Sequence, residues 1–263
     1  MEQAESISVI AVARRRVFPR GFVDFLFQIL LWFGFLFAYK VARSFADSGD
    51  SARDVAYRNA RWVVDFERGA HSLFELSLQK TLLSSRLLID LASATYWLSQ
   101  FVVLGGVLLW VYLWRTESFT RFRNWVMLAN FIGLIGYVLV PTAPPRMLGN
   151  AGFVDTLLVY SGLNQSSSAV ATFANPYAAM PSLHAADALI VGLSMAFICR
   201  RLWVKVLWLA WPLWVWFTVM ATANHFWLDV AGGVLVALVA APIVDSRFRF
   251  WRRSPEAPEP VAA

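Results

Sequence analysis

The stretch YAAMPSLHAADALIVG, Tyr177–Gly192, places a histidine and an aspartate at the beginning of an apolar run. The run has the composition of a membrane helix, yet it opens with a proline, a serine and a histidine. Proline is favoured at the first position of a helix, where its missing N–H would have no partner. We therefore expect a membrane helix over Pro181–Cys199 whose polar first turn carries His184 and Asp187.

The composition of the whole chain places this helix in a multi-pass membrane protein. Of the 263 residues, 59% are hydrophobic and 15% are charged, whereas soluble domains reach roughly 25% charged. A bilayer core of about 30 Å requires about 20 apolar residues per helix. Six segments approach that length: Phe22–Ala42, Leu87–Trp114, Trp125–Val140, Pro181–Cys199, Leu202–Ala221 and Phe226–Val244. The predicted fold is an all-α bundle of six transmembrane helices over residues 22–246.

The segment between the first two spans, residues 51–86, is too charged to cross a membrane. Its apolar residues recur at helical spacing: Trp62, Val63, Phe66, Leu73, Phe74 and Leu76. The pattern predicts amphipathic helices that lie on the membrane surface, with a break at Gly69. Glu67 and Glu75 are expected to cap a helix or to pair with Arg61 or Arg68.

Basic residues predict the orientation of the bundle. They flank the spans in four groups: Arg14, Arg15, Arg16 and Arg20; Arg115, Arg121 and Arg123; Arg200, Arg201 and Lys205; Arg247, Arg249, Arg252 and Arg253. With six spans all four groups fall on one side, which the positive-inside rule makes cytoplasmic. A basic N-terminus, residues 1–21, and a basic, Pro-rich tail, residues 247–263, are then both cytoplasmic. The pI of 9.8 reflects this topology and anionic headgroups rather than nucleic acid.

Three polar segments fall at the opposite, extracytoplasmic ends of the spans. We therefore predict a protein of the cell membrane whose site faces the extracytoplasmic side. They are PTAPPRM (Pro141–Met147), MPSLH (Met180–His184) and NHFWLD (Asn224–Asp229). In the second, the helix start presents the N–H groups of Ser182 and the two following residues, which favours an anion. The Ser182 hydroxyl adds a contact and His184 can transfer a proton, although an ordinary interfacial histidine fits the pattern as well.

The other two segments add a second histidine and a cation. His225 and Asp229 are four residues apart and share a helix face. Asp229, bound to one ring nitrogen, would leave the other nitrogen of His225 as a nucleophile or base, or the two would form a buried pair that joins helices. Arg146 follows a Pro-rich bend, and its planar fork suits phosphate oxygens, or it contacts a lipid headgroup.

Together these residues match the needs of phosphoryl transfer through a phosphohistidine. One histidine attacks phosphorus, a carboxylate orients that histidine, and the second histidine protonates the leaving oxygen. An arginine and backbone N–H groups stabilise the charge. No metal and no cofactor is expected in this scheme.

The ordered set resembles the type 2 phosphatidic acid phosphatase superfamily, a family of six-helix membrane enzymes. PSLH resembles its Pro-Ser-Gly-His motif, and His225-x-x-x-Asp229 resembles the end of its Ser-Arg-x5-His-x3-Asp motif; the two histidines stand 41 residues apart. The resemblance implies that His225 is the nucleophile, Asp229 its orienting partner and His184 the proton donor. It also implies phosphate contacts from Arg146 and Ser182.

Departures from the motifs indicate a branch of the family. The first motif, Lys-x6-Arg-Pro, has Leu139 and Met147 at its lysine and proline positions, and the Ser-Arg pair is replaced by Thr218-Val219. The prolines before Arg146 and Asn224 before His225 are more similar to the branch of inositol phosphorylceramide synthase. Those enzymes pass a phosphoinositol headgroup to a lipid hydroxyl, and a phosphodiester, with one charge at phosphorus, needs fewer cations.

Several alternatives stay open at the level of sequence. The substrate is expected to be a phospholipid or a prenyl phosphate, and the reaction hydrolysis or headgroup transfer. Asp187 is expected to bond across to a neighbouring helix or to orient His184, and Asn224 to support the site. A transporter or flippase, with His184, Asp187, His225 and Asp229 as a proton relay, is the second candidate; a metal site is a third. Oligomeric state has no signature.

Overall fold

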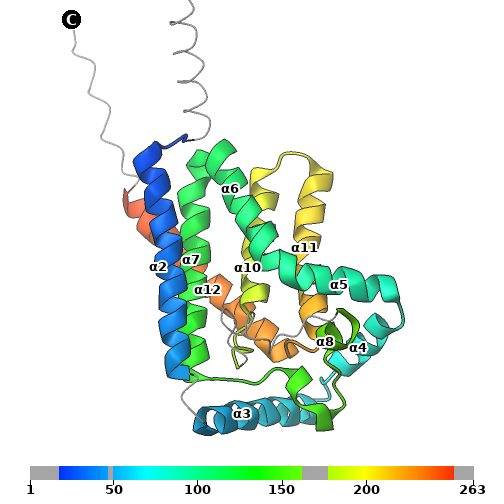
Figure 1. The fold of residues 1–263 in the computed structure, drawn as a ribbon. Helices are drawn as coiled ribbons and strands as arrows, with labels where there is room; N and C mark the ends of the chain where they lie inside the picture. The colour runs from blue at the N-terminus through cyan, green and yellow to red at the C-terminus, as the bar shows by residue number, and fades with distance from the viewer. Residues whose placement is uncertain (1–17, 47–49, 162–176, 252–263) are drawn as a thin grey trace, which may run out of the picture.

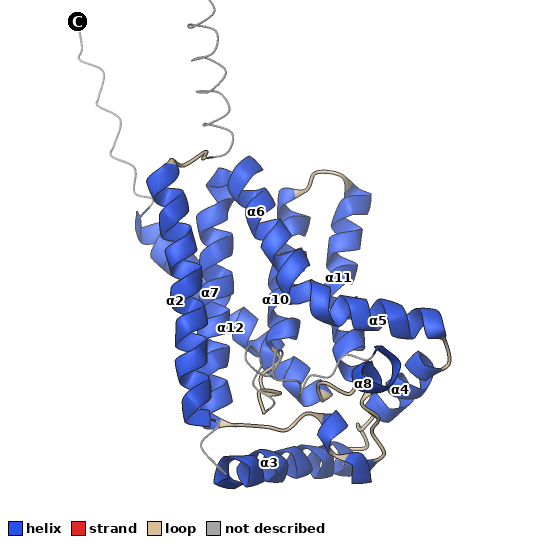
Figure 2. Ribbon diagram, viewed as in Figure 1, coloured by secondary structure: helices blue, strands red, loops and turns tan. Residues whose placement is uncertain are grey.

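A computed structural model describes residues 18–46, 50–161 and 177–251, and the regular structure within them is helical (Figures 1 and 2). One isolated parallel bridge, between Thr142 and Ala178, is the exception. The basic N-terminal segment up to residue 17 and the predicted Pro-rich tail from residue 252 lie outside the described residues.

Six helical paths form the bundle, as predicted. They are α2 (Phe22–Ala46), the continuous path of α5 (Arg86–Leu98), η1 (Ser99–Val103) and α6 (Leu104–Trp114), then α7 (Thr116–Leu139), α10 (Leu183–Ile198), α11 (Leu202–Ala221) and α12 (Trp227–Trp251). Among the described residues, five of these paths are long and apolar enough to cross a membrane. The sixth, α10, has 16 residues, about 24 Å at 1.5 Å per residue.

Two helix starts differ from the predicted ones. Helix α7 begins at Thr116, not at Trp125, so Arg121 and Arg123 lie within it. Their charges are accommodated because Arg121 pairs with Asp245 at 2.7 Å, while Arg123 donates to Gln28 at 2.7 Å. Helix α10 begins at Leu183, so Pro181 precedes the helix rather than occupying its first position.

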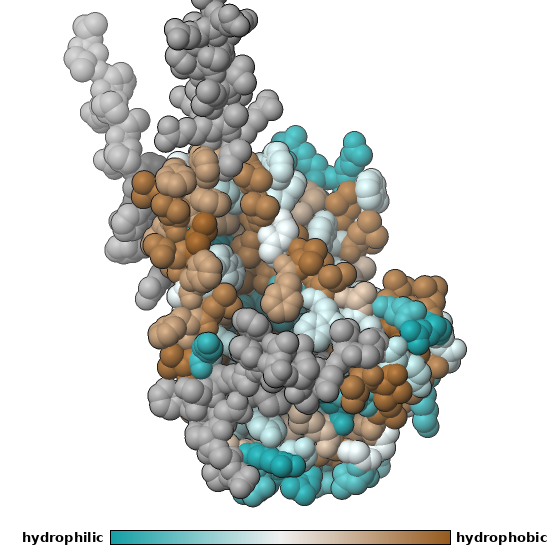
Figure 3. Space-filling model, in the orientation of Figure 1, coloured by the Kyte–Doolittle hydropathy of each residue, from teal (hydrophilic) through white to brown (hydrophobic). Residues whose placement is uncertain are grey.

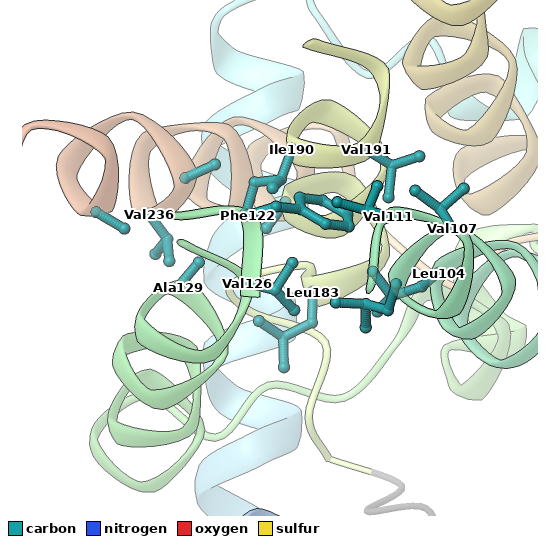
Figure 4. Close-up of a cluster of buried hydrophobic side chains, with 14 of the residues drawn as sticks. Leu104, Val107, Val111, Phe122, Val126, Ala129, Leu183, Ile190, Val191 and Val236 are labelled. Atoms are coloured by element: carbon teal, nitrogen blue, oxygen red, sulfur yellow. The ribbon is translucent and has the colours of Figure 1, made fainter. Parts of the chain in front are cut away.

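The central core of the bundle comes from four paths (Figure 4). Its buried side chains include Leu104, Val107 and Val111 of α6, Phe122, Val126 and Ala129 of α7, Leu183, Ile190 and Val191 of α10, and Val236 of α12. Burial of one such side chain contributes about 1.5–3 kcal/mol in water, but between membrane helices close packing is the main source of stability. Helix α10 is therefore surrounded by protein, whereas α2 packs along α7 at the edge of the bundle (Figure 1).

Glycines allow two helices to approach the beginning of α10. A Cβ at Gly133 or Gly136 of α7 would overlap Leu183 or Pro181, and a Cβ at Gly233 of α12 would overlap the carbonyl oxygen of Ser182. Small residues at such crossings are typical of membrane helices. The first turn of α10 is thus held between α7 and α12.

The predicted surface segment forms two helices, α3 (Asp50–Gly69) and α4 (Glu75–Leu83), and α3 ends at the predicted break. One face of α3, with Ala56, Ala60 and Val63, is buried against the loops before α8 (Thr156–Ser161) and α12. Trp62 and Phe66 stack on each other at 5.6 Å and remain exposed. The segment therefore covers the polar loops as well as presenting an apolar edge to its surroundings.

The two ends of the bundle differ in what they carry. The beginning of α2, the α6–α7 turn and the α10–α11 loop lie at one end, and α3, α4 and α8 lie at the other (Figure 1). In this view hydrophobic side chains dominate the middle of the bundle, whereas hydrophilic ones gather over α3 and at the α10–α11 loop of the opposite end (Figure 3). This distribution is that of a multi-pass membrane protein.

Candidate active site

The three polar segments meet at the α3 end, around one cavity of about 580 Å³. Five of the predicted site residues line it: Arg146, His184, Asp187, Asn224 and His225. The other two, Ser182 and Asp229, are completely buried behind it. The wall away from these polar residues is formed by apolar side chains of α2 and α6.

A tight turn places His225 at the cavity. Helix α11 ends at Ala221 and is capped by Thr222. The next residue, Ala223, has a φ of +59°, the left-handed conformation that often follows a helix end. The turn lets the N–H groups of Asn224 and His225 both donate to the carbonyl of Val219 at 3.0 Å. His225 is 4% exposed, and its ring faces the cavity.

The ring of His225 is held differently from the prediction. Nδ1 lies 2.9 Å from the carbonyl oxygen of Ala179, and since a carbonyl only accepts, Nδ1 carries the proton. Asp229 Oδ2 is 3.6 Å from Nδ1, an ion-pair distance and too long for a hydrogen bond. That oxygen instead accepts the N–H of Phe226 at 2.8 Å. Nε2 is therefore the ring nitrogen left to react.

His184 lies in the first turn of α10. Ser182 caps this helix, accepting the N–H of Ala185 at 3.3 Å, and its own N–H donates to the carbonyl of Asp229 at 2.9 Å. Of the N–H groups predicted for anion binding, that of Ser182 is thus already used. The ring centroids of His184 and His225 are 5.8 Å apart.

Tyr96 is a neighbour of His184 that the sequence did not reveal. The two rings stack with centroids 4.6 Å apart and planes at 22°. Tyr96 lies in α5, one turn before the π-helical segment η1; such segments occur frequently at functional sites. The sequence could not predict this contact, because Tyr96 and His184 are far apart in the chain.

Asp187 bonds across to neighbouring helices, one of the two roles expected for it. Its Oδ1 accepts from Asn130 Nδ2 of α7 at 2.7 Å, and Oδ2 accepts from Gln100 Nε2 of η1 at 3.4 Å. The carboxyl group therefore ties three helices together one turn below His184.

Arg146 and Asn224 form a pair at the cavity wall. Arg146 donates to Asn224 Oδ1 at 2.7 Å, and its backbone N–H donates to the carbonyl of Ala223 at 2.8 Å. The guanidinium lies 3.7 Å from Asp155, which the sequence analysis had not singled out, and the side chain is 8% exposed. Burial lowers the pKa of Arg146 below its ordinary value.

The positions of the missing family cations are apolar here. Leu139 is 73% exposed at the end of α7, and Val219 is buried among Ala185, Ala188 and Val215. Among the described residues that line the cavity, Arg146 is the only lysine or arginine.

Glu67 and Glu75 cap a helix, one of the two roles expected for them, and neither pairs with Arg61 or Arg68 within the described residues. Both are completely buried and accept backbone N–H groups of α12, from Leu228 at 3.2 Å and from Trp227 at 2.6 Å. Burial raises the pKa of Glu67 to about 9 and raises the pKa of Glu75. Within the described residues, no three His, Cys, Asp or Glu side chains are arranged to hold a metal ion.

Comparisons with known proteins find relatives of part of this chain. A phosphoinositol dihydroceramide synthase of Bacteroides thetaiotaomicron is 31% identical over 136 residues, 47% of this chain and 44% of that protein. The inositol phosphorylceramide synthase of Candida albicans is 22% identical over 122 residues, 41% of this chain and 26% of that protein. The catalytic subunit of the Saccharomyces cerevisiae inositol phosphorylceramide synthase is 26% identical over 144 residues, 46% of this chain and 35% of that protein.

The chain therefore matches less than half the length of each of these relatives. No solved structure matches it. The family model of the PAP2 superfamily matches residues 61–243, which include the second half of α3, all of α4 and every polar residue of the site described above. This chain belongs to the PAP2 superfamily.

Proposed function

We propose that this chain is a membrane enzyme that cleaves or transfers a lipid-linked phosphate ester through a phosphohistidine at His225. The observation that carries the proposal is the pair of histidines, with ring centroids 5.8 Å apart, facing one cavity beside the Arg146–Asn224 pair. A phosphorus atom between the rings would have a nucleophile on one side and a proton donor on the other.

The first step forms a bond from His225 Nε2 to phosphorus and breaks the bond from phosphorus to the leaving oxygen. His184, protonated, gives its proton to that oxygen. Because Nδ1 donates to Ala179, the imidazole becomes cationic as Nε2 attacks, and Asp229 at 3.6 Å stabilises this charge. Arg146 binds the phosphoryl oxygens with its planar fork.

The second step reverses the proton transfer. A water molecule or a lipid hydroxyl gives its proton to His184 and attacks phosphorus, and the bond from phosphorus to Nε2 breaks. Water gives hydrolysis and a lipid hydroxyl gives transfer. Both reactions use the same residues without a metal ion.

The charge of the cavity favours a phosphodiester. One guanidinium, Arg146, balances the single negative charge of a diester, whereas a monoester bears nearly two. The relatives are named as synthases that handle inositol phosphate and ceramide. We therefore place transfer of a phosphoinositol headgroup from a phospholipid to a lipid hydroxyl ahead of hydrolysis.

The apolar part of the cavity suits the tail of such a lipid. Its wall includes Phe25, Ile29 and Trp32 of α2 and Leu104 and Leu108 of α6. Because α2 is packed mainly along α7, its other face is available to the bilayer. A lipid would then reach His225 from the membrane with its headgroup at the α3 end.

Turnover by purified protein tests the proposal. Phosphate release and headgroup transfer are measured in detergent with a chelator present, using phosphatidate, a prenyl diphosphate or phosphatidylinositol with a ceramide acceptor. His225→Ala should lose at least about 10³-fold in kcat. His71→Asn is the matched control, because His71 is exposed and asparagine tolerates its φ of +53°.

The product identifies the reaction. Inositol phosphorylceramide indicates transfer, whereas inositol phosphate from phosphatidylinositol, or free phosphate from phosphatidate or prenyl diphosphate, indicates hydrolysis. Equal activity of wild type and His225→Ala would contradict the phosphohistidine. Absence of turnover on all three substrates, together with proton-coupled lipid flux in vesicles, would favour the transporter that the sequence left open. Loss of activity in chelator would contradict the metal-independent chemistry.

A further inference from the structure

The three N–H groups that follow His225 in the chain are each bound by a different carboxyl group. The pairs are Phe226 N–H to Asp229 Oδ2 at 2.8 Å, Trp227 N–H to Glu75 Oε1 at 2.6 Å and Leu228 N–H to Glu67 Oε1 at 3.2 Å. Two of the three carboxyl groups come from α4 and α3, far away in the sequence. The beginning of α12, and with it His225, is thus tied to the surface segment.

Three buried carboxylates close together would destabilise the fold unless their total negative charge were reduced. Glu67, Glu75 and Asp229 are all 0% exposed. Neither glutamate forms an ion pair with a lysine or arginine of the described chain. The N-terminus of α12 offers roughly half a positive charge, which does not balance three carboxylates.

A shared proton resolves this imbalance. Oε2 of Glu67 and Oε2 of Glu75 are buried without a donor, although the two carboxyl groups are within hydrogen-bonding reach of each other. Two carboxylates can only accept, but a proton on one of them supplies the donor. Glu67 and Glu75 each act on the pKa of the other, and the charge of Asp229 acts on both.

We infer that Glu67 and Glu75, sharing one proton, are positioning residues for His225. They fix the N–H groups of the first turn of α12 and thereby hold Asp229 and the His225 ring in place. Loss of either carboxyl group would leave one N–H group of this turn without its acceptor and let the turn shift. A displacement of about 1 Å at a reacting group costs on the order of 10²-fold in rate. The effect on turnover rests on the proposed function, but the ring geometry is measured without substrate.

Three variants separate positioning from folding. Glu67→Ala removes the acceptor of the Leu228 N–H. Glu67→Gln keeps an acceptor oxygen and supplies a permanent donor to Glu75, so it replaces the shared proton. Asp65→Asn is the matched control, since Asp65 is an exposed carboxyl group on the same helix.

Ring-¹⁵N NMR of histidine-labelled protein reads out the geometry. The chain has three histidines, so His225→Asn and His71→Asn assign the spectrum. We expect Glu67→Ala to shift the His225 signals and leave His71 unchanged, while Glu67→Gln and Asp65→Asn keep wild-type signals. Wild-type His225 signals in Glu67→Ala would overturn the inference. A Glu67→Gln spectrum as disturbed as that of Glu67→Ala would also overturn it.

Kinetics on the substrate that the wild type turns over then measures the consequence. Glu67→Ala should lower kcat tenfold to a hundredfold with KM within threefold, and Glu67→Gln should stay within threefold in both. An unchanged kcat in Glu67→Ala would overturn the positioning role. If the wild type turned over no substrate, the proposed function would fail while the NMR result would still decide the inference.

Discussion

At the scale of single residues, the Nδ1 proton of His225 is accepted by a backbone carbonyl rather than by a carboxylate. The carbonyl of Ala179 sets the tautomer, and Asp229 contributes charge at 3.6 Å while it binds the Phe226 N–H. Substitution of Asp229 therefore affects both the charge near the ring and the start of α12. The two effects are separable, because substitution of Glu67 or Glu75 affects only the start of α12 and not the charge near the ring.

The role of His184 predicts a dependence on the leaving group. His184→Asn should lower kcat on a phospholipid by 10²–10⁴-fold, the usual contribution of a general acid. With a nitrophenyl phosphodiester the initial burst of nitrophenolate, which reports the first step alone, should slow by less than tenfold, because nitrophenolate leaves without a proton. His225→Ala should remain inactive on both substrates. Equal losses by His184→Asn on the two substrates would contradict the proton-donor role.

The acid pair predicts how stability depends on pH. Burial raises the pKa of Glu67 to about 9 from an ordinary value of 4.5. Between these values the folded protein holds a proton that the unfolded chain has lost, so stability falls as pH rises. We expect the Tm in detergent to decrease from pH 6 to pH 9 in wild type and in Asp65→Asn.

Glu67→Gln removes the titrating group and should flatten this decrease in Tm. Glu75 then remains as a single carboxylate with an amide donor. Parallel Tm curves for Glu67→Gln and wild type would show that the decrease has another source.

At the scale of elements, the beginning of α10 is the point where the site is assembled. Pro181 and Leu183 contact glycines of α7, and Ser182 contacts α12 through Gly233. The hydrogen bond from the Ser182 N–H to the Asp229 carbonyl joins the same two helices. The distance between the two histidines is therefore set by close packing at the beginning of α10 together with the turn before α12 that carries His225.

Two neighbouring glycines test this packing. In Gly233→Ala the new Cβ would overlap the Ser182 carbonyl oxygen, which is backbone and cannot move alone, whereas in Gly232→Ala it would lie 3.3 Å from Pro181 Cβ. Gly233→Ala should destabilise the protein by about 1–3 kcal/mol and reduce kcat at least tenfold. Gly232→Ala should change the stability and kcat little. Thermal unfolding measures the stability, and turnover measures kcat. Equal effects of the two variants would contradict this account.

At the scale of the whole molecule, the fold separates a basic end from a catalytic end. Arg20, Arg115 and Arg200 lie at or near the beginning of α2, the α6–α7 turn and the α10–α11 loop, all at the end away from α3 (Figure 1). We expect this end to be cytoplasmic by the positive-inside rule. With 16 residues, α10 is also shorter than the bilayer core of about 30 Å, so we expect His184 to lie below the headgroup plane.

The single native cysteine makes the orientation measurable. Cys199 follows α10 at the basic end, and Asn150 is exposed at the catalytic end. In intact cells a membrane-impermeant maleimide should not label wild type, and it should label the double variant Cys199→Ala, Asn150→Cys. Permeabilised cells provide the control for reactivity. Labelling of Cys199 from outside would reverse the topology.

Some of this protein was determined by its sequence alone. The long apolar runs dictate membrane helices, because no other element satisfies its backbone in lipid. The spacing of His225 and Asp229, the helix start at MPSLH and the Pro-rich segment at Arg146 predicted three of the parts that line or back the cavity. These features are local or periodic, so the order of residues along the chain suffices to reveal them.

Tertiary structure decided what those residues contact. The carbonyl of Ala179 on His225, the Tyr96 ring on His184 and the carboxyl groups of Glu67 and Glu75 on α12 all come from segments distant in the chain. A glutamate on an amphipathic helix has the same sequence signature whether it faces water or a helix terminus. Only packing removed water from these two side chains, and that desolvation makes them the buried support that we infer for His225.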